Sequence, residues 1–231
     1  MPSKIHLDYA VYPHLLPQCT SLFFQAIKEK GGSLSSPYRE TLFLQKEYTL
    51  TLASLLSILE LNEGDLFIPT SGVQETMLNL LFSHYFHTVR ETGKNHFLIL
   101  ASENKPIFSA LSHLENLGCA TTSLSLNKEG ILDAFLLKNA LKPRSSFLSL
   151  SVANPLTGVI QPLEEIGELC KEKGIFLHLE ISSLIANSHL SLSELPWDAL
   201  SFDTEQLGCP PGSGALILEE APPFILFEPL L

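Results

Sequence analysis

Short apolar runs alternate with longer amphipathic stretches along this chain, and that alternation restricts the fold more than any other feature of the sequence. Strands that are apolar on both faces and separated by helices are typical of a parallel sheet covered by helices on both sides. The apolar runs predict strands at residues 4–8, 65–69, 96–101, 120–126, 146–152, 175–180, 199–203 and 214–218. The amphipathic stretches predict helices at residues 15–30, 39–61, 72–88, 106–117, 132–141 and 163–173.

Composition narrows the class of protein and of partner. Hydrophobic residues are 45% of the 231 residues and charged residues only 17%, which indicates a well-buried domain that can also bury a face in an oligomer. The net charge of −11 argues against nucleic acid and anionic membrane as partners. No apolar run has the length of a membrane span and the N-terminus lacks a signal-peptide core, so the expected location is the cytoplasm. The four Cys lie far apart without metal-ligand spacing, which predicts plain buried thiols.

Parallel sheets bind ligands at the carboxyl ends of their strands, where helix N-termini point their N–H groups. After strand 65–69, the small residues Thr70, Ser71 and Gly72 lead straight into a helix. This turn suits a phosphate group, although an ordinary turn capped by Ser71 or Thr70 is the simpler explanation. After strand 146–152, Asn154 begins an Asn-Pro turn, and its side chain can either shape the turn or bind a ligand hydroxyl.

Carboxylates follow two further strands. Glu180 ends strand 175–180, and Asp203 ends strand 199–203 with Glu205 two residues beyond it. A carboxylate at the end of a buried strand is costly without a partner, so Glu180 indicates a site more strongly than a surface Glu does. A neighbouring backbone N–H would also satisfy it.

The order and spacing of these segments together resemble the large domain of the class V aminotransferases, and most closely the cysteine desulfurases. Ile-His-Leu-Asp-Tyr at 5–9 is similar to the family's opening strand, and Ser35-Ser36 falls where the family often has Asn-Pro-Ser-Ser. Thr-Ser-Gly-Val-Gln-Glu at 70–75 is similar to the family's Thr-Ser-Gly-Ala-Thr-Glu. Residues 154–166 resemble Asn-x-x-x-Gly-x-x-Gln and the helix after it, and Phe-Leu-His-Leu-Glu at 176–180 resembles the strand His-Val-Asp. Residues 201–216 bracket the place of Ser-Gly-His-Lys and Gly-Pro-Lys-Gly-x-Gly-Ala-Leu.

The resemblance implies an α/β three-layer sandwich with a mostly parallel sheet, like the large domain of the fold type I transferases that use pyridoxal phosphate (PLP). It also implies a place for the cofactor. The positions that correspond to the family's PLP-binding residues are Val73, Gln74, Asn104, Asn154, Glu180, Ser183, Asp203, Glu205 and Gln206.

Most of these positions depart from the family pattern. Gln206 stands at the place of the Lys that forms the Schiff base with PLP and then moves the substrate proton, and an amide can do neither. Residues 174–231 contain no Lys or Arg that could replace it. Asp203 and Glu205 stand where the family uses Ser and His to bind the phosphate. The remaining changes are Gln74 for Thr, Asn104 for His, Glu180 for Asp and Ser183 for Gln, whereas Asn154 matches.

These departures predict a degenerate cofactor site in a single large domain over residues 1–231, without the family's small C-terminal domain. We expect no catalytic residue and no metal. No cofactor is expected either, with PLP bound only if the site is still functional. The expected partner is a second copy of the chain, a full-length relative or a sulfur acceptor, and neither nucleic acid nor membrane.

Two other functions stay open at this point. The chain is an active PLP-dependent desulfurase or aminotransferase if another Lys, such as Lys105, serves as the Schiff base. It binds a cation or an amine if Glu180, Asp203 and Glu205 converge in a remodelled cleft. Cys209 lies in the Gly/Pro-rich turn nearest the cofactor site, where an incidental thiol is favoured over a nucleophile because no basic neighbour is evident.

Overall fold

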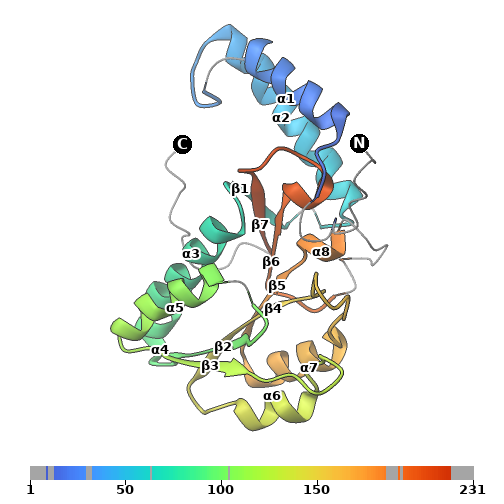
Figure 1. Ribbon diagram of the computed structural model, residues 1–231. Coiled ribbons are helices and arrows are strands. Elements are labelled where there is room, and N and C mark those ends of the chain that lie inside the picture. Colours follow the sequence, from blue (N-terminus) through green and yellow to red (C-terminus); the bar gives the residue numbers. More distant parts are fainter. Residues whose placement is uncertain are drawn as a thin grey trace, which may run out of the picture.

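A seven-stranded mixed sheet forms the centre of the molecule (Figure 1). The computed structural model describes residues 9, 13–29, 33–62, 64–103, 105–185, 192 and 195–219, without the side chains of residues 40, 105 and 106. The strands are β1 (Leu66–Thr70), β2 (His96–Leu100), β3 (Ala120–Leu124), β4 (Ser145–Ser151), β5 (Phe176–Glu180), β6 (Ala199–Asp203) and β7 (Gly214–Leu218). Their spatial order is β1-β7-β6-β5-β4-β2-β3.

The sheet is mostly parallel, as expected. The neighbouring pairs from β3 through β2, β4 and β5 to β6 all run parallel, and only β7 runs antiparallel to its neighbours β6 and β1. The carboxyl ends of β2, β4, β5 and β6 therefore lie at one edge of the sheet. Residues that follow these strands are brought together there, although the sequence separates them widely.

Helices cover both faces of the sheet and make it the middle of three layers (Figure 1). One side carries α3 (Val73–His84), the short α4 (Arg90–Thr92) and α5 (Lys105–Asn116), and the other carries α6 (Ala134–Ala140) and α7 (Leu163–Lys173). Each strand contributes apolar side chains to both helix layers, because successive side chains of a strand point to opposite faces of the sheet. In β2, Phe97 and Ile99 join the core that contains α3 and α5, whereas Leu98 and Leu100 join the core that contains α6 and α7.

Two helices project beyond this three-layer body. In Figure 1, α1 (Pro17–Glu29) and α2 (Arg39–Ile58) extend from the end of the molecule that carries β1 and β7. No residue of α1 is buried. Large apolar side chains on this pair of helices, which we call the arm, are exposed; they include Leu22, Phe24, Ile27, Phe43 and Ile58. The arm therefore carries apolar surface that the rest of the described chain leaves uncovered.

Several expectations need correction. The helix predicted at 72–88 ends as an α-helix at His84 and continues as a π-helical turn over Tyr85–Val89. Its N-cap is Gly72, with no side-chain cap from Thr70 or Ser71. The strand predicted at 65–69 as buried is the half-exposed edge strand β1. The one-turn helices α8 (Ser182–Ile185) and η3 (Thr204–Leu207) were not predicted.

Two further expectations concern residues at the chain's beginning and the membrane. The strand predicted at residues 4–8 lies outside the described residues. In the part of the chain that the structure describes, no helix combines the length and the apolar character needed to span a bilayer.

Candidate functional site

The N-terminus of α3 lies at the carboxyl edge of the sheet, and a carboxylate of the same chain already occupies it. The backbone N–H of Val73, the first residue of α3, donates a 2.6 Å hydrogen bond to Oδ1 of Asp203. Asp203 ends β6, and its own N–H donates to Ser182 Oγ at 2.8 Å. A negative charge at this place is favourable, because the first N–H groups of a helix lack intrahelical partners and the helix dipole is positive there.

Two glycines allow Asp203 to come this close. Gly72 has φ +139°, and a Cβ built on it would lie 3.0 Å from Asp203 Oδ1. A Cβ on Gly214, at the start of β7, would lie 2.6 Å from the carbonyl oxygen of Phe202 and 2.9 Å from Gly72 Cα. A side chain on Gly214 would therefore overlap the backbones of β6 and of the α3 turn, and one on Gly72 would crowd the Asp203 carboxylate.

Glu180 lies deeper at the same edge. It ends β5, is 7% exposed, and its Oε1 accepts a 2.8 Å hydrogen bond from the N–H of Ser182. The neighbouring backbone N–H that the sequence left as an alternative is thus present. Burial raises the pKa of Glu180 above its usual range, and the nearby charge of Asp203 adds to that shift.

A third carboxylate, Glu103, was missed by the sequence-based reasoning. It follows β2, is 8% exposed, and accepts hydrogen bonds from the N–H of Ser151 at 2.5 Å and from Ser151 Oγ at 2.8 Å. Burial is the main cause that raises the pKa of Glu103 to about 7, with a smaller contribution from Glu180. Its position after a buried strand was a usable signal, identical in kind to that of Glu180.

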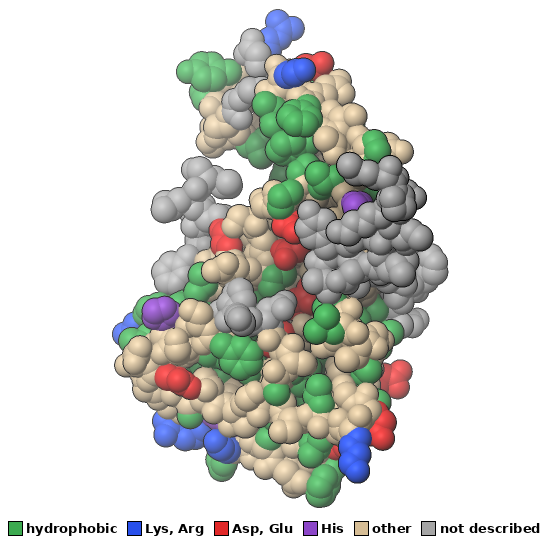
Figure 2. Space-filling view, in the orientation of Figure 1, with side chains coloured by type: hydrophobic (Ala, Val, Ile, Leu, Met, Phe, Trp, Pro, Cys, Tyr) green, Lys and Arg blue, Asp and Glu red, His purple; other side chains and the backbone are tan. Residues whose placement is uncertain are grey.

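These carboxylates form a row along the carboxyl ends of β2, β5 and β6. Figure 2 shows acidic side chains in the middle of the face that is turned to the viewer. Burial also raises the pKa of Asp203, which outweighs the opposite effect of the Val73 N–H, and Glu205 adds to the rise. Within the described residues, no three His, Cys, Asp or Glu side chains gather as metal ligands would. The cation-binding alternative therefore lacks a ligand set there.

The remaining predicted site residues divide into three groups. The side chain of Asn154 stabilises its own turn, because its Oδ1 accepts hydrogen bonds from the N–H groups of Leu156 at 3.0 Å and Thr157 at 3.1 Å. Asn104 lies outside the described residues. Others lie at the expected edge: Gln74 is exposed on α3, and Ser183 and Glu205 are partly buried on α8 and η3, where Glu205 contributes to the raised pKa of Asp203.

Gln206 lines a cavity of about 330 Å³. The cavity is lined by Tyr9, His14, Ile185 and Gln206, among others. Pro13, His14 and Leu16, which precede α1, cover this side, and the N–H of Leu16 donates to the carbonyl of Gly208 at 2.8 Å. The segment before α1 is therefore fixed on the turn that carries Gln206.

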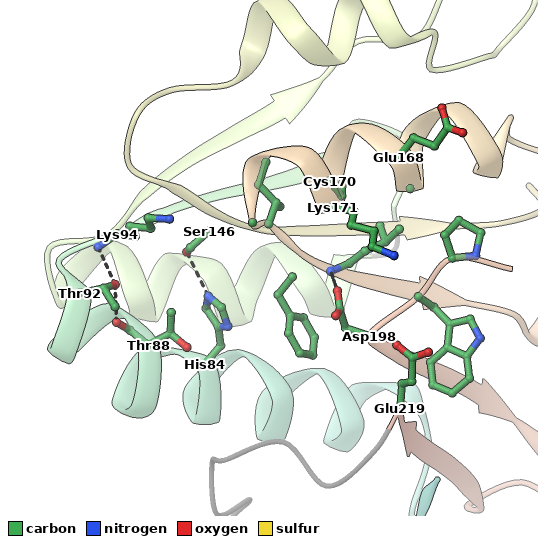
Figure 3. Close-up of a pocket in the computed structure, with 17 residues that line it drawn as sticks. His84, Thr88, Thr92, Lys94, Ser146, Glu168, Cys170, Lys171, Asp198 and Glu219 are labelled. Atoms are coloured by element: carbon green, nitrogen blue, oxygen red, sulfur yellow. Dashed lines mark hydrogen bonds between the residues drawn. The ribbon is translucent and has the colours of Figure 1, made fainter. Parts of the chain in front are cut away.

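A larger cavity, of about 680 Å³, lies at the opposite edge, where β4, β5 and β6 begin (Figure 3). His84 and Ser146 lie toward one end of it and Asp198 and Glu219 toward the other. His84 Nε2 and Ser146 Oγ are 3.0 Å apart, and His84 Nδ1 has no hydrogen-bond partner among the described residues. Burial lowers the pKa of His84 to about 3, so the ring is neutral at physiological pH. No pattern in the sequence predicted this cavity.

Comparison with known proteins agrees with the architecture. The family model described as "Aminotransferase class-V" matches residues 48–224. A cysteine desulfurase IscS from Rickettsia massiliae is 36% identical over 129 residues, which is 56% of this chain and 32% of the relative. A probable mitochondrial cysteine desulfurase from Dictyostelium discoideum is 33% identical over 129 residues, or 56% of this chain and 29% of that protein. The matched segment is thus about a third of these relatives.

Solved structures share the fold over almost the whole chain. A NifS-like protein superimposes with a TM-score of 0.87 at 18% identity, covering 99% of this chain and 62% of its own. SspA, solved in complex with cysteine, gives a TM-score of 0.83 at 20% identity, covering 92% of this chain and 60% of its own. Because the family model matches residues 48–224 and the mostly parallel sheet agrees with it, the chain belongs to the class V aminotransferase family.

Proposed function

We propose that this chain is a cysteine desulfurase-like member of the family that carries out no PLP chemistry and acts as an oligomeric or partner-binding protein. The observation that carries the proposal is the hydrogen bond from the Val73 N–H to the Asp203 carboxylate. That N–H belongs to the turn at which the resemblance places the cofactor phosphate. The residues present do not fit the cofactor, because the turn is filled by a carboxylate of the chain itself.

Electrostatics support this misfit. A phosphate brought to the α3 turn would lie beside Asp203 and near Glu205. Two like unit charges 4 Å apart cost about 4 kcal/mol at an effective dielectric constant near 20. The raised pKa of Asp203 lessens this cost only when the carboxyl is protonated, and Asp203 would then lose its charge-assisted bond to Val73.

Gln206 supports the same conclusion, because it cannot form the covalent Schiff base with PLP. The amide is neither a nucleophile nor a proton carrier, and no Lys or Arg occurs in residues 174–231. Gln206 also lines the cavity bordered by His14 and Leu16. The alternative of an active PLP enzyme would need Lys105 or another upstream Lys to form the Schiff base.

The arm supports the partner-binding part of the proposal. Exposed apolar patches of this kind mark protein interaction sites in soluble proteins. Leu22, Phe24 and Ile27 are 65%, 55% and 61% exposed on α1 alone. We propose a second copy of this chain as the partner on the arm, with a full-length relative or a sulfur acceptor as the alternatives. In this proposal the chain is one large domain in the cytoplasm, without cofactor and without nucleic-acid or membrane partners.

A PLP titration tests the cofactor part. The purified chain is mixed with PLP, its absorbance is recorded in the aldimine band, and the sample is reduced with borohydride for intact mass. We expect no band and no adduct for the natural sequence. The combined variant Asp203→Ser, Glu205→His and Gln206→Lys restores the family residues and is expected to gain a reducible adduct. A stoichiometric adduct on the natural sequence, or sulfide release from cysteine, would overturn the proposal.

Light scattering coupled to gel filtration tests the partner part. We expect a mass of two chains for the natural sequence and of one chain for the variant Phe24→Glu with Ile27→Glu. Phe135→Glu is the matched control, because Phe135 is 72% exposed on α6, away from the arm. A single-chain mass for the natural sequence at micromolar concentration would remove self-association, and mixing with a full-length desulfurase would then test the alternative.

A further inference from the structure

Two cysteines that are 190 positions apart in the sequence meet where α1 reaches the body. Cys19 lies in the first turn of α1 and Cys209 follows η3, and their Sγ atoms are 3.7 Å apart. Both are partly exposed, whereas Cys119 and Cys170 are buried. The expectation that all four are plain buried thiols is therefore wrong for this pair.

Backbone contacts fix the approach of the two thiols. Gly208 has φ +76°, and a Cβ on it would lie 2.6 Å from Leu16 Cγ, so glycine lets the segment before α1 sit directly on this turn. Leu16 donates to the Gly208 carbonyl at 2.8 Å, and Cys209 N–H donates to the Thr204 carbonyl at 3.2 Å. Cys19 lies three residues beyond Leu16 and Cys209 one residue beyond Gly208. The contact of the thiols is thus a consequence of the Leu16–Gly208 contact.

We propose that Cys19 and Cys209 are a redox-active pair that forms a reversible disulfide and fastens α1 to the turn carrying Gln206. An S–S bond is about 2 Å long, so a small side-chain movement closes the gap. Exposed thiols that lie next to a second Cys are the ones typical of reversible oxidation, and cytosolic disulfides are usually of this transient kind. No other His, Cys, Asp or Glu among the described residues joins them as metal ligands, which favours sulfur chemistry over metal binding.

The reaction balances with a low-molecular-weight disulfide such as glutathione disulfide as the oxidant. One protein thiolate attacks a sulfur of the oxidant, which forms a mixed disulfide and releases one small thiol. The second protein thiolate then attacks the protein sulfur of the mixed disulfide and releases the second small thiol. Two protein thiols are oxidised, the external disulfide is reduced to two thiols, and the two protons pass to the leaving thiolates.

Closure would act on two features described above. It ties the first turn of α1 to the turn whose residues Gln206 and Gly208 line the 330 Å³ cavity, and it fixes the apolar face of α1 relative to the body. Burial is the main cause that raises the pKa of Cys209, and the adjacent Cys19 adds to it. Closure is therefore expected to be faster at pH 9 than at pH 7, since the thiolate is the reacting form. None of this depends on whether the chain binds PLP.

The test incubates the full chain with mixtures of reduced and oxidised glutathione, alkylates the remaining thiols and determines intact mass and linked peptides. We expect one crosslink between the peptides that contain Cys19 and Cys209, with two thiols still alkylated after unfolding. The oxidised form is expected to melt about 5–10 °C higher than the reduced form, because the crosslink closes a long loop.

Matched variants separate this result from general oxidation. Cys19→Ser and Cys209→Ser are each expected to abolish the crosslink and the melting difference, leaving at most one glutathione adduct. Cys119→Ser and Cys170→Ser are expected to leave both unchanged, because burial raises the pKa of these thiols to about 11 and about 12. Absence of the Cys19–Cys209 crosslink at full oxidant excess, or its replacement by two separate glutathione adducts, would overturn the proposal.

Discussion

At the carboxyl ends of β2, β5 and β6 the molecule buries carboxyl groups, whereas near the amino ends of β2 and β4 it buries imidazoles. Glu103, Glu180 and Asp203 have raised pKa values at the first edge. His84 and His96 have pKa values lowered to about 3 and about 4 at the other. In each case burial is the main cause, because a low-dielectric interior favours the neutral form of either group. The two edges therefore respond to pH in opposite directions.

The partners at the two edges also differ. The carboxylates accept hydrogen bonds from backbone N–H groups of Val73, Ser151 and Ser182. The imidazoles pair with hydroxyl groups of Ser and Thr, as His96 does with Ser145 at 2.6 Å and Thr122 at 2.8 Å. A hydroxyl adapts to either tautomer of a neutral ring, and an N–H favours an acceptor. At each edge the buried ionisable groups are therefore satisfied by suitable hydrogen-bond partners and not by an opposite charge.

The largest effect is expected at His178, in the middle of β5. Its ring is fully buried between Ser149 Oγ at 2.8 Å and Ser201 Oγ at 2.9 Å, and burial lowers its pKa to about 3. His178→Leu leaves both hydroxyls without the ring and is expected to cost about 2–3 kcal/mol of unfolding free energy at pH 7. Urea denaturation followed by circular dichroism measures it.

The same variant tests the sign of the pH response. The folded pKa of about 3 lies below the ordinary 6.5, so the imidazole's contribution is complete above pH 6.5 and is lost as the pH falls toward 3. Linkage gives a loss of about 2 kcal/mol between pH 7 and pH 5 for one such group. The deficit of His178→Leu is therefore expected to shrink by about that amount at pH 5. An unchanged deficit would show that the ring is not held neutral.

Substitution of Glu103, at the opposite edge of the sheet, is expected to change the unfolding free energy by about 2 kcal/mol. Its folded pKa of about 7 lies above the ordinary 4.5, so the penalty for ionising it is absent below pH 4.5, grows between pH 4.5 and pH 7, and is complete above pH 7. Glu103→Gln keeps an acceptor for the Ser151 N–H and is expected to stabilise the fold at pH 8 but not at pH 5. Thermal denaturation at the two pH values measures it.

Glu75→Gln is the control for that prediction. Glu75 lies on the same side of the molecule and accepts from the Ser71 N–H at 2.6 Å, and that hydrogen bond lowers its pKa. Its substitution is expected to give no stabilisation at pH 8. A gain as large as that of Glu103→Gln would mean that net charge, and not burial, controls this edge.

The smallest effect is expected at the large cavity. Ser146→Ala removes the hydroxyl paired with His84 Nε2 and is expected to cost about 1 kcal/mol, equally at pH 7 and pH 8 because His84 is neutral at both. Ser83→Ala is the matched control, since Ser83 Oγ is buried and has no partner among the described residues. It is expected to be neutral or slightly stabilising, as measured by urea denaturation. Equal losses in the two variants would contradict the paired role of Ser146.

The sequence was sufficient for elements whose apolar pattern is long and uninterrupted. The predicted strand at 214–218 and helix at 163–173 coincide with β7 and α7. The pattern was insufficient where a single turn decides the structure, as in α8 and η3, and where hydrogen bonding shifts within a continuous helix, as at Tyr85–Val89. Strand direction was not encoded either, since an apolar strand such as β7 reads the same in both orientations.

The sequence predicted where the candidate site lies, but it did not predict which residues form hydrogen bonds there. Strand-end reasoning located Glu180 and Asp203 correctly at one edge of the sheet. It could not show that Asp203 bonds to Val73 or that Glu103 bonds to Ser151, because these partners are 130 and 48 positions away. The same holds for Cys19 and Cys209. Contacts across the layers require the strand order, which one sequence without relatives does not supply.

The close meeting of Gly72, Gly214 and Asp203 has a consequence for how this protein could change over generations. A lost glycine at such a contact is hard to recover, because the surrounding backbone would have moved to make space. Here both glycines remain, and one exchangeable side chain closes the turn. We therefore expect that selection in the laboratory for phosphate binding would begin at residue 203, and that the route back to an open anion site is a short one.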